Sequence, residues 1–293
     1  MYKTMSPLRY PGGKSNLAPL IKYIIEHKSN QNITTYIEPF AGGAGVALNL
    51  LISGTVSNII INDYDKAIYS FWRSVITEPE RFIETIIKTP VTIEEWRKQK
   101  EIYITLNNKY SFELGFATFF LNRTNRSGIL SAGPIGGYEQ TGNYLIDARF
   151  NKDSLISRIS KIAQYRNHIK VYNKDIRNFI RLVMVNNQDN SFVYFDPPYY
   201  IKGKELYFNF FQNDDHTEIR DAIIQNVNCQ WLMTYDIEDN ITNIYNGYTQ
   251  RQYDLTYSLA NKGKASELII FSDSELCPSN SELVNAGIKT RFL

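Results

Sequence analysis

Cysteine is scarce in this chain of 293 residues, which contains only Cys229 and Cys277. Neither belongs to a CxxC pair or to a Cys/His cluster, so the sequence predicts no disulfide framework and no metal site. The three histidines are scattered along the chain and are not expected to act in catalysis. This sparing use of thiols is typical of proteins in a reducing compartment, and a cytoplasmic location is therefore expected.

Long apolar runs are absent as well. No stretch approaches the roughly 20 residues that a membrane-spanning helix needs, and the opening residues lack the apolar core of a signal peptide. The formal net charge is only +2, so overall charge does not indicate a nucleic-acid partner, and only local basic segments can do so. With 43% hydrophobic and 21% charged residues, the composition predicts a folded globular chain.

The order of the predicted elements indicates an α/β fold. Residues 34–51, TTYIEPFAGGAGVALNLL, have the pattern of a strand, a glycine turn and a helix. A buried strand follows at 59–61, and further strands are expected in the segments 169–175, 191–196, 229–236 and 266–273. Strand, turn, helix and strand in this order predict a doubly wound, mostly parallel sheet.

The middle of the chain has a different character. From about residue 66 to residue 165 the pattern is helical and mixed, and it includes a stretch rich in Gly, Asn, Ser and Thr at 121–144. Loops of this length inside a compact domain are usually functional or disordered. The sequence therefore predicts a catalytic domain built from residues 1–70 and 166–293, with an inserted module over residues 71–165.

The glycine turn and the acid that follows it indicate a nucleoside site. Gly42, Gly43 and Gly45 lack side chains, so the backbone can approach a ligand closely at the carboxyl end of a strand. Asp63 ends the next strand, near the roughly 20-residue spacing at which an acid binds ribose hydroxyls. A dinucleotide fingerprint would need glycine where Leu48 stands. The pattern favours a nucleoside without a phosphate chain, most commonly S-adenosylmethionine, and a plain tight turn is the alternative.

The stretch FVYFDPPYY, residues 192–200, has the residue types that methylation of a nucleobase amine requires. Such an amine is a poor nucleophile, and acceptors for its N–H groups stabilise the positive charge that develops during attack on a methyl sulfonium. Asp196 offers a carboxylate, Pro197 an oriented carbonyl, and Pro198 keeps the turn extended. Tyr199 offers a ring on which a flipped-out base can stack. An ordinary strand end is the alternative for this segment taken alone.

These motifs, in this order, resemble those of the Dam-type (D12 class) adenine-specific DNA methyltransferases. The segment LRYPGGKSNL is similar to the N-terminal cofactor motif of that family, YIEPFAGGAGVALNL to its glycine-rich motif, and INDYD to its ribose-binding acid. LNRTNRSGI resembles its target-recognition signature and FDPPYY its catalytic motif. The resemblance implies the S-adenosylmethionine-dependent methyltransferase fold, with residues 71–165 as the DNA target-recognition domain, and methyl transfer to the N6 amine of a flipped-out adenine in duplex DNA.

The resemblance also implies roles for individual residues. Asp175 would accept a hydrogen bond from the adenine amine of S-adenosylmethionine, and Asp63 would bind its ribose. The full set of implied cofactor contacts is Tyr10, Lys14, Phe40, Ala41, Gly42, Gly43, Gly45, Asp63, Asp175 and Asp196. The target adenine would be held by Asp196, Pro197, Pro198 and Tyr199. The recognition segment departs from that of the best-known GATC methylators, so no target sequence is transferred.

Local charge adds a candidate DNA surface. Residues 114–138 and 255–266 contain no acidic residue, and such loops suit contacts with phosphates. Arginine and asparagine can also read base edges. The candidate DNA-binding residues are Asn122, Arg123, Asn125, Arg126, Lys262 and Lys264; a merely solvated loop is the alternative. The expected partner is double-stranded DNA and not a membrane. The protein is expected to be a monomer or a weak dimer. A cognate restriction endonuclease is a further candidate that the sequence alone does not reveal.

Three alternative functions stay open at the level of sequence. The acceptor could be the N4 amine of cytosine or a base in RNA, although Asp at position 196 favours adenine by family analogy. A DNA-binding module that has lost catalysis is a second alternative. An ATP-binding protein is suggested by the GKS triplet, but a P-loop would need glycine where Leu8 stands.

Overall fold

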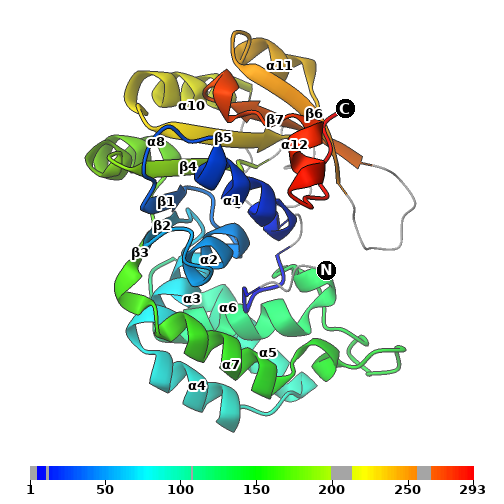
Figure 1. Ribbon diagram of the computed structural model, residues 1–293. Helices are drawn as coiled ribbons and strands as arrows, with labels where there is room; N and C mark the ends of the chain where they lie inside the picture. Colours follow the sequence, from blue (N-terminus) through cyan, green and yellow to red (C-terminus); the bar gives the residue numbers. More distant parts are fainter. Residues whose placement is uncertain (1–4, 11–12, 107, 199–212, 256–264) are drawn as a thin grey trace. The chain divides into compact units, whose positions relative to one another are not determined.

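A computed structural model describes residues 5–10, 13–106, 108–198, 213–255 and 265–293 (Figure 1). Its strands form one seven-stranded sheet in the order β3-β2-β1-β4-β5-β7-β6. The strands are β1 (Thr35–Glu38), β2 (Asn58–Asn62), β3 (Ile169–Tyr172), β4 (Ser191–Phe195), β5 (Gln230–Tyr235), β6 (Thr249–Leu255) and β7 (Ala265–Phe271).

Most of the helices lie between β2 and β3 or after β4 in the sequence. The α-helices are α1 (Ala18–His27), α2 (Gly45–Ile52), α3 (Lys66–Thr77), α4 (Pro79–Lys88), α5 (Ile93–Leu106), α6 (Phe112–Thr124), α7 (Lys152–Ala163), α8 (Ile176–Phe179), α10 (Asn213–Asn226), α11 (Asp239–Ile244) and α12 (Asn280–Asn285). Shorter helical turns are η1 (Ser15–Leu17), η2 (Arg126–Gly128), η3 (Ile146–Arg149), η4 (Arg166–His168), η5 (Ile180–Met184), η6 (Val185–Asn187) and η7 (Ser274–Leu276). Among the described residues, no helix has the length and hydrophobicity that crossing a bilayer requires.

The chain divides into two compact units, each assembled from separate segments. The first unit comprises residues 1–15, 41–52 and 61–174, and the second comprises residues 16–40, 53–60 and 175–293. The glycine turn and the acid at 63 therefore belong to the first unit, whereas the DPP segment belongs to the second. The domain boundaries expected from the sequence stay a prediction.

The second unit contains the central strands. Every residue of β4 and β5 is buried, which explains why these strands have continuous apolar sequences without alternation. β4 pairs in parallel with β1, where Ile37 is opposite Val193, and in parallel with β5, where Phe195 is opposite Met233. The carboxyl ends of these three strands therefore lie at the same edge of the sheet, the edge at which ligands of parallel sheets bind.

The other end of the sheet is antiparallel. β7 pairs with β5 and also with β6, which is the last strand in the sheet order. β6 was not predicted, because its sequence, TQRQYDL, has no apolar run. Edge strands commonly carry polar residues, so the pattern that reveals a central strand is missing there. The predicted doubly wound, mostly parallel sheet is confirmed, with this antiparallel pair added.

The first unit has a helical core of phenylalanine rings. The rings of Phe71 (α3) and Phe82 (α4) are 5.8 Å apart, Phe82 and Phe119 (α6) 5.4 Å, and Phe119 and Phe150 5.5 Å. Edge-on contacts of this kind stabilise aromatic clusters beyond the area they bury. The helices α3 to α7 agree with the helical pattern predicted for this stretch. The expected loop at 121–144 begins later, since residues 121–124 form the last turn of α6.

Gly115 allows α6 to approach α3 closely. A methyl group at this Cα would lie 2.5 Å from the carbonyl oxygen of Ser70 and 2.7 Å from Oγ of Ser74. Gly115→Ala is therefore expected to lower the free energy of unfolding by about 1–3 kcal/mol through overpacking, measured by urea denaturation. Gly133→Ala is the matched control, because its methyl group would make only ordinary contacts, the nearest at 3.6 Å. Equal stability of the two variants would contradict this account.

Candidate active site

In the first unit the glycine turn is held through both backbone polar groups of one residue, Gly42. Gly42 has a φ of +45°, which residues with a side chain rarely adopt. Its N–H donates to Oδ2 of Asp63 at 2.8 Å, and its carbonyl accepts from Nε1 of Trp72 at 2.8 Å. These two bonds fix the turn relative to the acid after β2. Trp72 could not be recognised from the sequence, because a tryptophan within an apolar helix gives no functional signal.

The N-terminal loop packs directly on this turn. A Cβ at Gly42 would lie 2.7 Å from Cε1 of Tyr10, and a Cβ at Gly43 would lie 3.1 Å from Cβ of Tyr10. At Gly45 it would lie 2.0 Å from Oγ of Ser15. The glycines are therefore needed to admit the loop, a reason that the sequence did not reveal. Lys14, in the same loop, is buried, with 7% of its surface exposed.

Asp63 is held by two backbone N–H donors, one on each carboxylate oxygen. Its Oδ2 accepts from the N–H of Gly42, and its Oδ1 accepts from the N–H of Asp65 at 2.9 Å. A carboxylate oxygen has two lone-pair directions, so each oxygen keeps one further acceptor position. Two such positions on one rigid carboxylate fit a pair of neighbouring hydroxyl groups. These observations support a nucleoside ligand at this turn.

The ionisation of Asp63 is sensitive near neutral pH. Burial, and then the charge of Asp65, raise the pKa of Asp63 to about 7, although the two backbone N–H donors act in the opposite direction. The folded protein therefore retains a proton that the unfolded chain would release. Stability falls as the pH rises from about 4 to about 7, and a ligand that donates to the ionised carboxylate offsets this cost.

In the second unit Asp175 caps a short helix and borders a pocket. Its Oδ1 accepts from the backbone N–H groups of Arg177 and Asn178, both at 3.1 Å, and its Oδ2 accepts from the amide of Asn178. Three of the four lone-pair directions of the carboxylate are therefore occupied, which leaves one acceptor position. The sequence placed Asp175 at the end of a strand, but β3 ends at Tyr172 and Asp175 begins α8.

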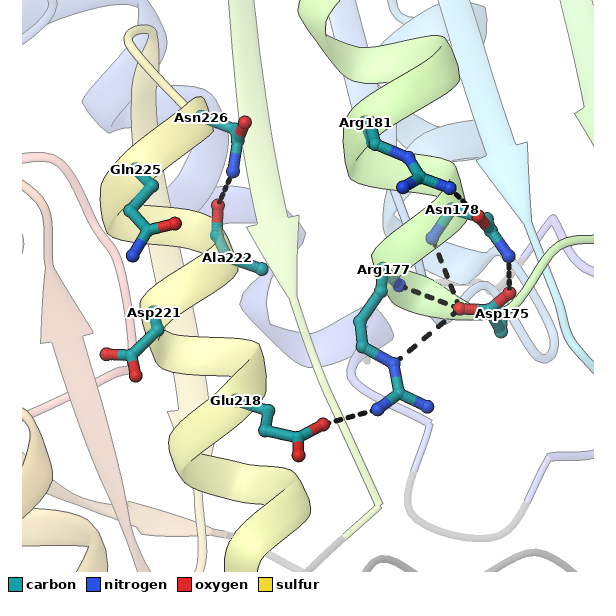
Figure 2. Close-up of a pocket in the computed structure, with 9 residues that line it drawn as sticks. All are labelled: Asp175, Arg177, Asn178, Arg181, Glu218, Asp221, Ala222, Gln225 and Asn226. Atoms are coloured by element: carbon teal, nitrogen blue, oxygen red, sulfur yellow. Dashed lines mark hydrogen bonds and ion pairs between the residues drawn. The ribbon is translucent and has the colours of Figure 1, made fainter.

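The pocket beside Asp175 has a volume of about 540 Å³ and polar walls. One wall is the start of α8 with η5, and the opposite wall is α10 (Figure 2). Arg177 points across it and forms an ion pair with Glu218. The lining residues are Asp175, Arg177, Asn178, Arg181, Glu218, Asp221, Ala222, Gln225 and Asn226. Sequence reasoning found only Asp175 among them.

Asp196 stands directly after β4, at the carboxyl edge shared with β1 and β5. Its Oδ1 accepts a hydrogen bond from Oγ1 of Thr234 at 2.9 Å, and Oγ1 of Thr234 is 2.7 Å from the hydroxyl of Tyr194. Pro197 is buried and Pro198 half-buried. The structure thus orients the carboxylate predicted to be catalytic through two residues that no motif revealed. Tyr199 lies outside the described residues.

The recognition signature has an internal role in the first unit. The amide of Asn122 pairs with the backbone of Arg9, because its Oδ1 accepts from Arg9 N at 2.7 Å and its Nδ2 donates to Arg9 O at 2.9 Å. Nδ2 also donates to the carbonyl of Gly128 at 2.9 Å. One asparagine therefore connects the N-terminal loop, α6 and η2.

Asn125 is likewise buried and occupied. Its Oδ1 accepts from Nε1 of Trp96 at 2.6 Å, and its Nδ2 donates to the carbonyls of Ile129 and Leu130 at 2.9 and 3.1 Å. Both amides are buried and use their N–H donors on backbone carbonyls, so they shape the segment that follows α6. A role of Asn122 and Asn125 in reading base edges stays a prediction.

The arginines of this region form a cationic group. Arg123 is half-buried and its Nε donates to the carbonyl of Arg149 at 2.7 Å. Burial, and then the charges of Arg9, Arg158 and Arg149, lower the pKa of Arg123 to about 9. Positive charges that repel one another in this way favour a polyanion. Arg126 is exposed, whereas Lys262 and Lys264 lie outside the described residues.

Comparison with known proteins agrees with these features. The model of the D12 class N6 adenine-specific DNA methyltransferases matches residues 10–260. The chain belongs to this family, and S-adenosylmethionine is the methyl donor that such membership implies. The predicted enzyme class, a site-specific DNA adenine methyltransferase, is confirmed.

Individual relatives are distant in sequence, but the alignments cover most of both chains. The type II methyltransferase M1.LlaDCHI of Lactococcus lactis subsp. cremoris is 24% identical, over 74% of this chain and 75% of its own. M.MjaIII of Methanocaldococcus jannaschii is 26% identical, over 72% of this chain and 74% of its own length. Among solved structures, the rRNA methyltransferase aviRa from Streptomyces viridochromogenes aligns over 91% of this chain and 88% of its own chain. The TM-score is 0.43 and the sequence identity 11%, a likeness too remote to bear on substrate.

The affinity for S-adenosylmethionine is expected to depend on the protonation of Asp63. If ribose hydroxyls donate to the ionised carboxylate, binding weakens by about tenfold between pH 8 and pH 6, because the pKa near 7 has to be crossed. Isothermal titration calorimetry across this range measures the change. In Asp63→Asn this proton-linked component is expected to disappear, leaving weaker binding with a flatter pH dependence. Parallel pH profiles for the two proteins would rule out the assignment.

Asn122→Ala is expected to weaken binding of S-adenosylmethionine although Asn122 acts only on backbone. The substitution releases the loop at Arg9, so binding has to order that loop and affinity falls by about three- to tenfold. Calorimetry gives the affinity and thermal unfolding the stability. Asn143→Ala, at an exposed asparagine of the same unit, is the control and is expected to bind normally. Unchanged affinity in Asn122→Ala would show that the hydrogen bonds of Asn122 serve stability alone.

Proposed function

We propose that Asp196 and Pro197 are the acceptors for the N6 amine of the target adenine in this DNA methyltransferase. The observation that supports this role best is the position of Asp196, directly after β4 at the carboxyl edge of parallel strands, with its carboxylate oriented by a buried hydroxyl. A carboxylate held in this way can accept from one N–H of an amine without first paying a large orientational entropy. The chain leaves β1 toward the glycine turn from the same edge.

The chemistry asked of these residues is charge stabilisation. S-adenosylmethionine, when bound, supplies a methyl group whose bonding electron pair returns to sulfur as the new N–C bond forms. The amine nitrogen becomes positive in this step and then loses one proton. Asp196 stabilises the developing charge through an N–H···O bond and is positioned to receive that proton. The carbonyl of Pro197 accepts from the second N–H, since proline fixes φ and has no donor of its own.

The cofactor contacts are proposed residue by residue. Asp63 uses its two remaining acceptor positions for the ribose hydroxyls, and Asp175 uses its one remaining position for the adenine amine. Tyr10 and Lys14 act from the N-terminal loop, and the backbone from Phe40 to Gly45 encloses the methionine part. The fit of Asp63 and Asp175 to donor groups, and the absence of a phosphate-binding motif in the sequence, support this assignment.

Duplex DNA is assigned to the cationic group of the first unit. This group contains Arg9 of the N-terminal loop, Arg123 of α6, Arg149 of η3 and Arg158 of α7. Phosphates would relieve the repulsion among these charges. The exposed side chain of Arg126 is the candidate for a direct base contact. The type II methyltransferases among the relatives support a role in protecting a specific DNA site from a cognate endonuclease.

Asp196→Ala is expected to lower the rate of methyl transfer by about a hundred- to a thousandfold, the loss typical when one preorganised hydrogen-bond partner of the transition state is removed, while both S-adenosylmethionine and DNA still bind. Labelled S-adenosylmethionine and mass spectrometry of the recovered nucleosides measure the product, and sequencing of the treated DNA gives the site. Asp239→Ala, at an exposed acid of the same unit, is the control. Label recovered only in N4-methylcytosine, or full activity in Asp196→Ala, would overturn the proposal.

A further inference from the structure

We infer that Thr234 and Tyr194 form a hydrogen-bond relay that positions Asp196 and keeps its carboxylate ionised for the target amine. This inference rests on the proposed role of Asp196 and adds two positioning residues to it. Neither belongs to the DPP segment: Tyr194 lies within β4, and Thr234 lies on the neighbouring strand β5. Both side chains are fully buried, with 0% of their surface exposed.

The register of the sheet brings the three side chains together. In the parallel pairing of β4 with β5, Tyr194 is opposite Leu232 and Phe195 is opposite Met233. One step further along both chains places Thr234 beside Asp196. Alternate residues of a strand project to the same face, so Tyr194 and Asp196 share the face on which Thr234 meets them. A shift of β5 by a single residue would turn the threonine to the opposite face and break the relay.

The hydrogen bonds of the relay have a defined direction. The distance from Thr234 Oγ1 to Asp196 Oδ1 is 2.9 Å, and that from Tyr194 Oη to Thr234 Oγ1 is 2.7 Å. An ionised carboxylate can only accept, and a threonine hydroxyl has a single proton to donate. Thr234 therefore donates a hydrogen bond to Asp196 and accepts a hydrogen bond from the hydroxyl of Tyr194. Successive bonds of this kind polarise one another in a buried setting.

The tyrosine remains a donor throughout the working pH range. Burial, followed by the negative charge of Asp196, raises the pKa of Tyr194 well above its usual value. Its hydroxyl therefore keeps its proton and can donate to Thr234. A donor fixed in this manner favours the charged form of Asp196 over the protonated form. The protonated form would lose the acceptor that the target amine needs.

Other ionisable groups also lie close to Asp196 in the second unit. Its negative charge helps to raise the pKa of Tyr36 (β1), Tyr235 (β5) and Tyr253 (β6) as well, although burial is the main cause in each case. The nearby acids are Glu38 at the end of β1, Asp236 after β5 and Glu267 on β7, whose carboxylate accepts from Tyr253. The pH dependence of catalysis must therefore be assigned by comparing variants that differ in one hydroxyl.

Three substitutions isolate the relay. Thr234→Val preserves the shape of the side chain but removes the donor to Asp196, whereas Thr234→Ser preserves that donor. Tyr194→Phe removes the hydroxyl that is the first donor of the relay. Tyr245→Phe is the matched control, because this buried tyrosine of the same unit lies outside the relay. Single-turnover methylation of DNA containing the sequenced site is measured as a function of pH, together with kcat, KM and thermal unfolding.

Thr234→Val is expected to lower kcat by about ten- to a hundredfold, which corresponds to one hydrogen bond to a charged group. KM for DNA and for S-adenosylmethionine should stay within about twofold, and the acid limb of the pH–rate profile should move to higher pH, because the donor that favours ionised Asp196 is gone. Thr234→Ser should keep most of the wild-type kcat. Tyr194→Phe should lose less kcat than Thr234→Val, and its acid limb should also move to higher pH. Tyr245→Phe should behave as wild type.

Two results would overturn the relay. One is a full rate with an unmoved acid limb in Thr234→Val. The other is an equal loss in Thr234→Ser and Thr234→Val that follows their thermal stability, which would indicate packing alone. Failure of the proposed function is distinguishable from both, because in that case Asp196→Ala itself retains methyl transfer.

Discussion

A carboxylate that is to accept hydrogen bonds from a ligand at a partly buried position has to be both oriented and able to ionise, and this constraint links the three acids that we propose as ligand contacts. Asp63 meets it with two backbone N–H donors, Asp175 with the first turn of α8, and Asp196 with the hydroxyl of Thr234. Each arrangement leaves the oxygen atoms fixed in direction. The supporting elements, the glycine turn, the short helix and the strand register, can be understood as the means of supplying those donors.

The first unit adds a mechanical connection to this chemistry. Tyr10 lies on the glycine turn, and Asn122 hydrogen-bonds both the backbone N–H and the carbonyl of the residue before it, Arg9. Asn122 also donates to the carbonyl of Gly128, the last residue of η2. The loop that packs on the glycine turn and the segment that follows α6 are thus both held by one side chain. A signature that suggests DNA contact by its residue types is here partly an internal brace.

Sequence patterns revealed the elements that are apolar or punctuated by glycine and proline. The central strands, the glycine turn, Asp63 and the DPP segment were all identifiable, because burial between helices or a special backbone conformation restricts the residues allowed there. β6 was missed because an edge strand needs no apolar run. The internal hydrogen bonds of Asn122 and Asn125 could not be foreseen, because an asparagine gives the same signal in the sequence whether it faces DNA or binds buried backbone.

By itself the sequence determined the fold class, the family and the acids proposed to bind the ligands, since these depend on residue types within short segments. Only the tertiary structure decided which donors hold those acids. Thr234 is 38 residues from Asp196, and Trp72 is 30 residues from Gly42, yet each pair is within hydrogen-bond distance. Such pairings arise from strand register and helix packing, in which contacts between distant segments are set by the whole fold. A local pattern contains no information about them.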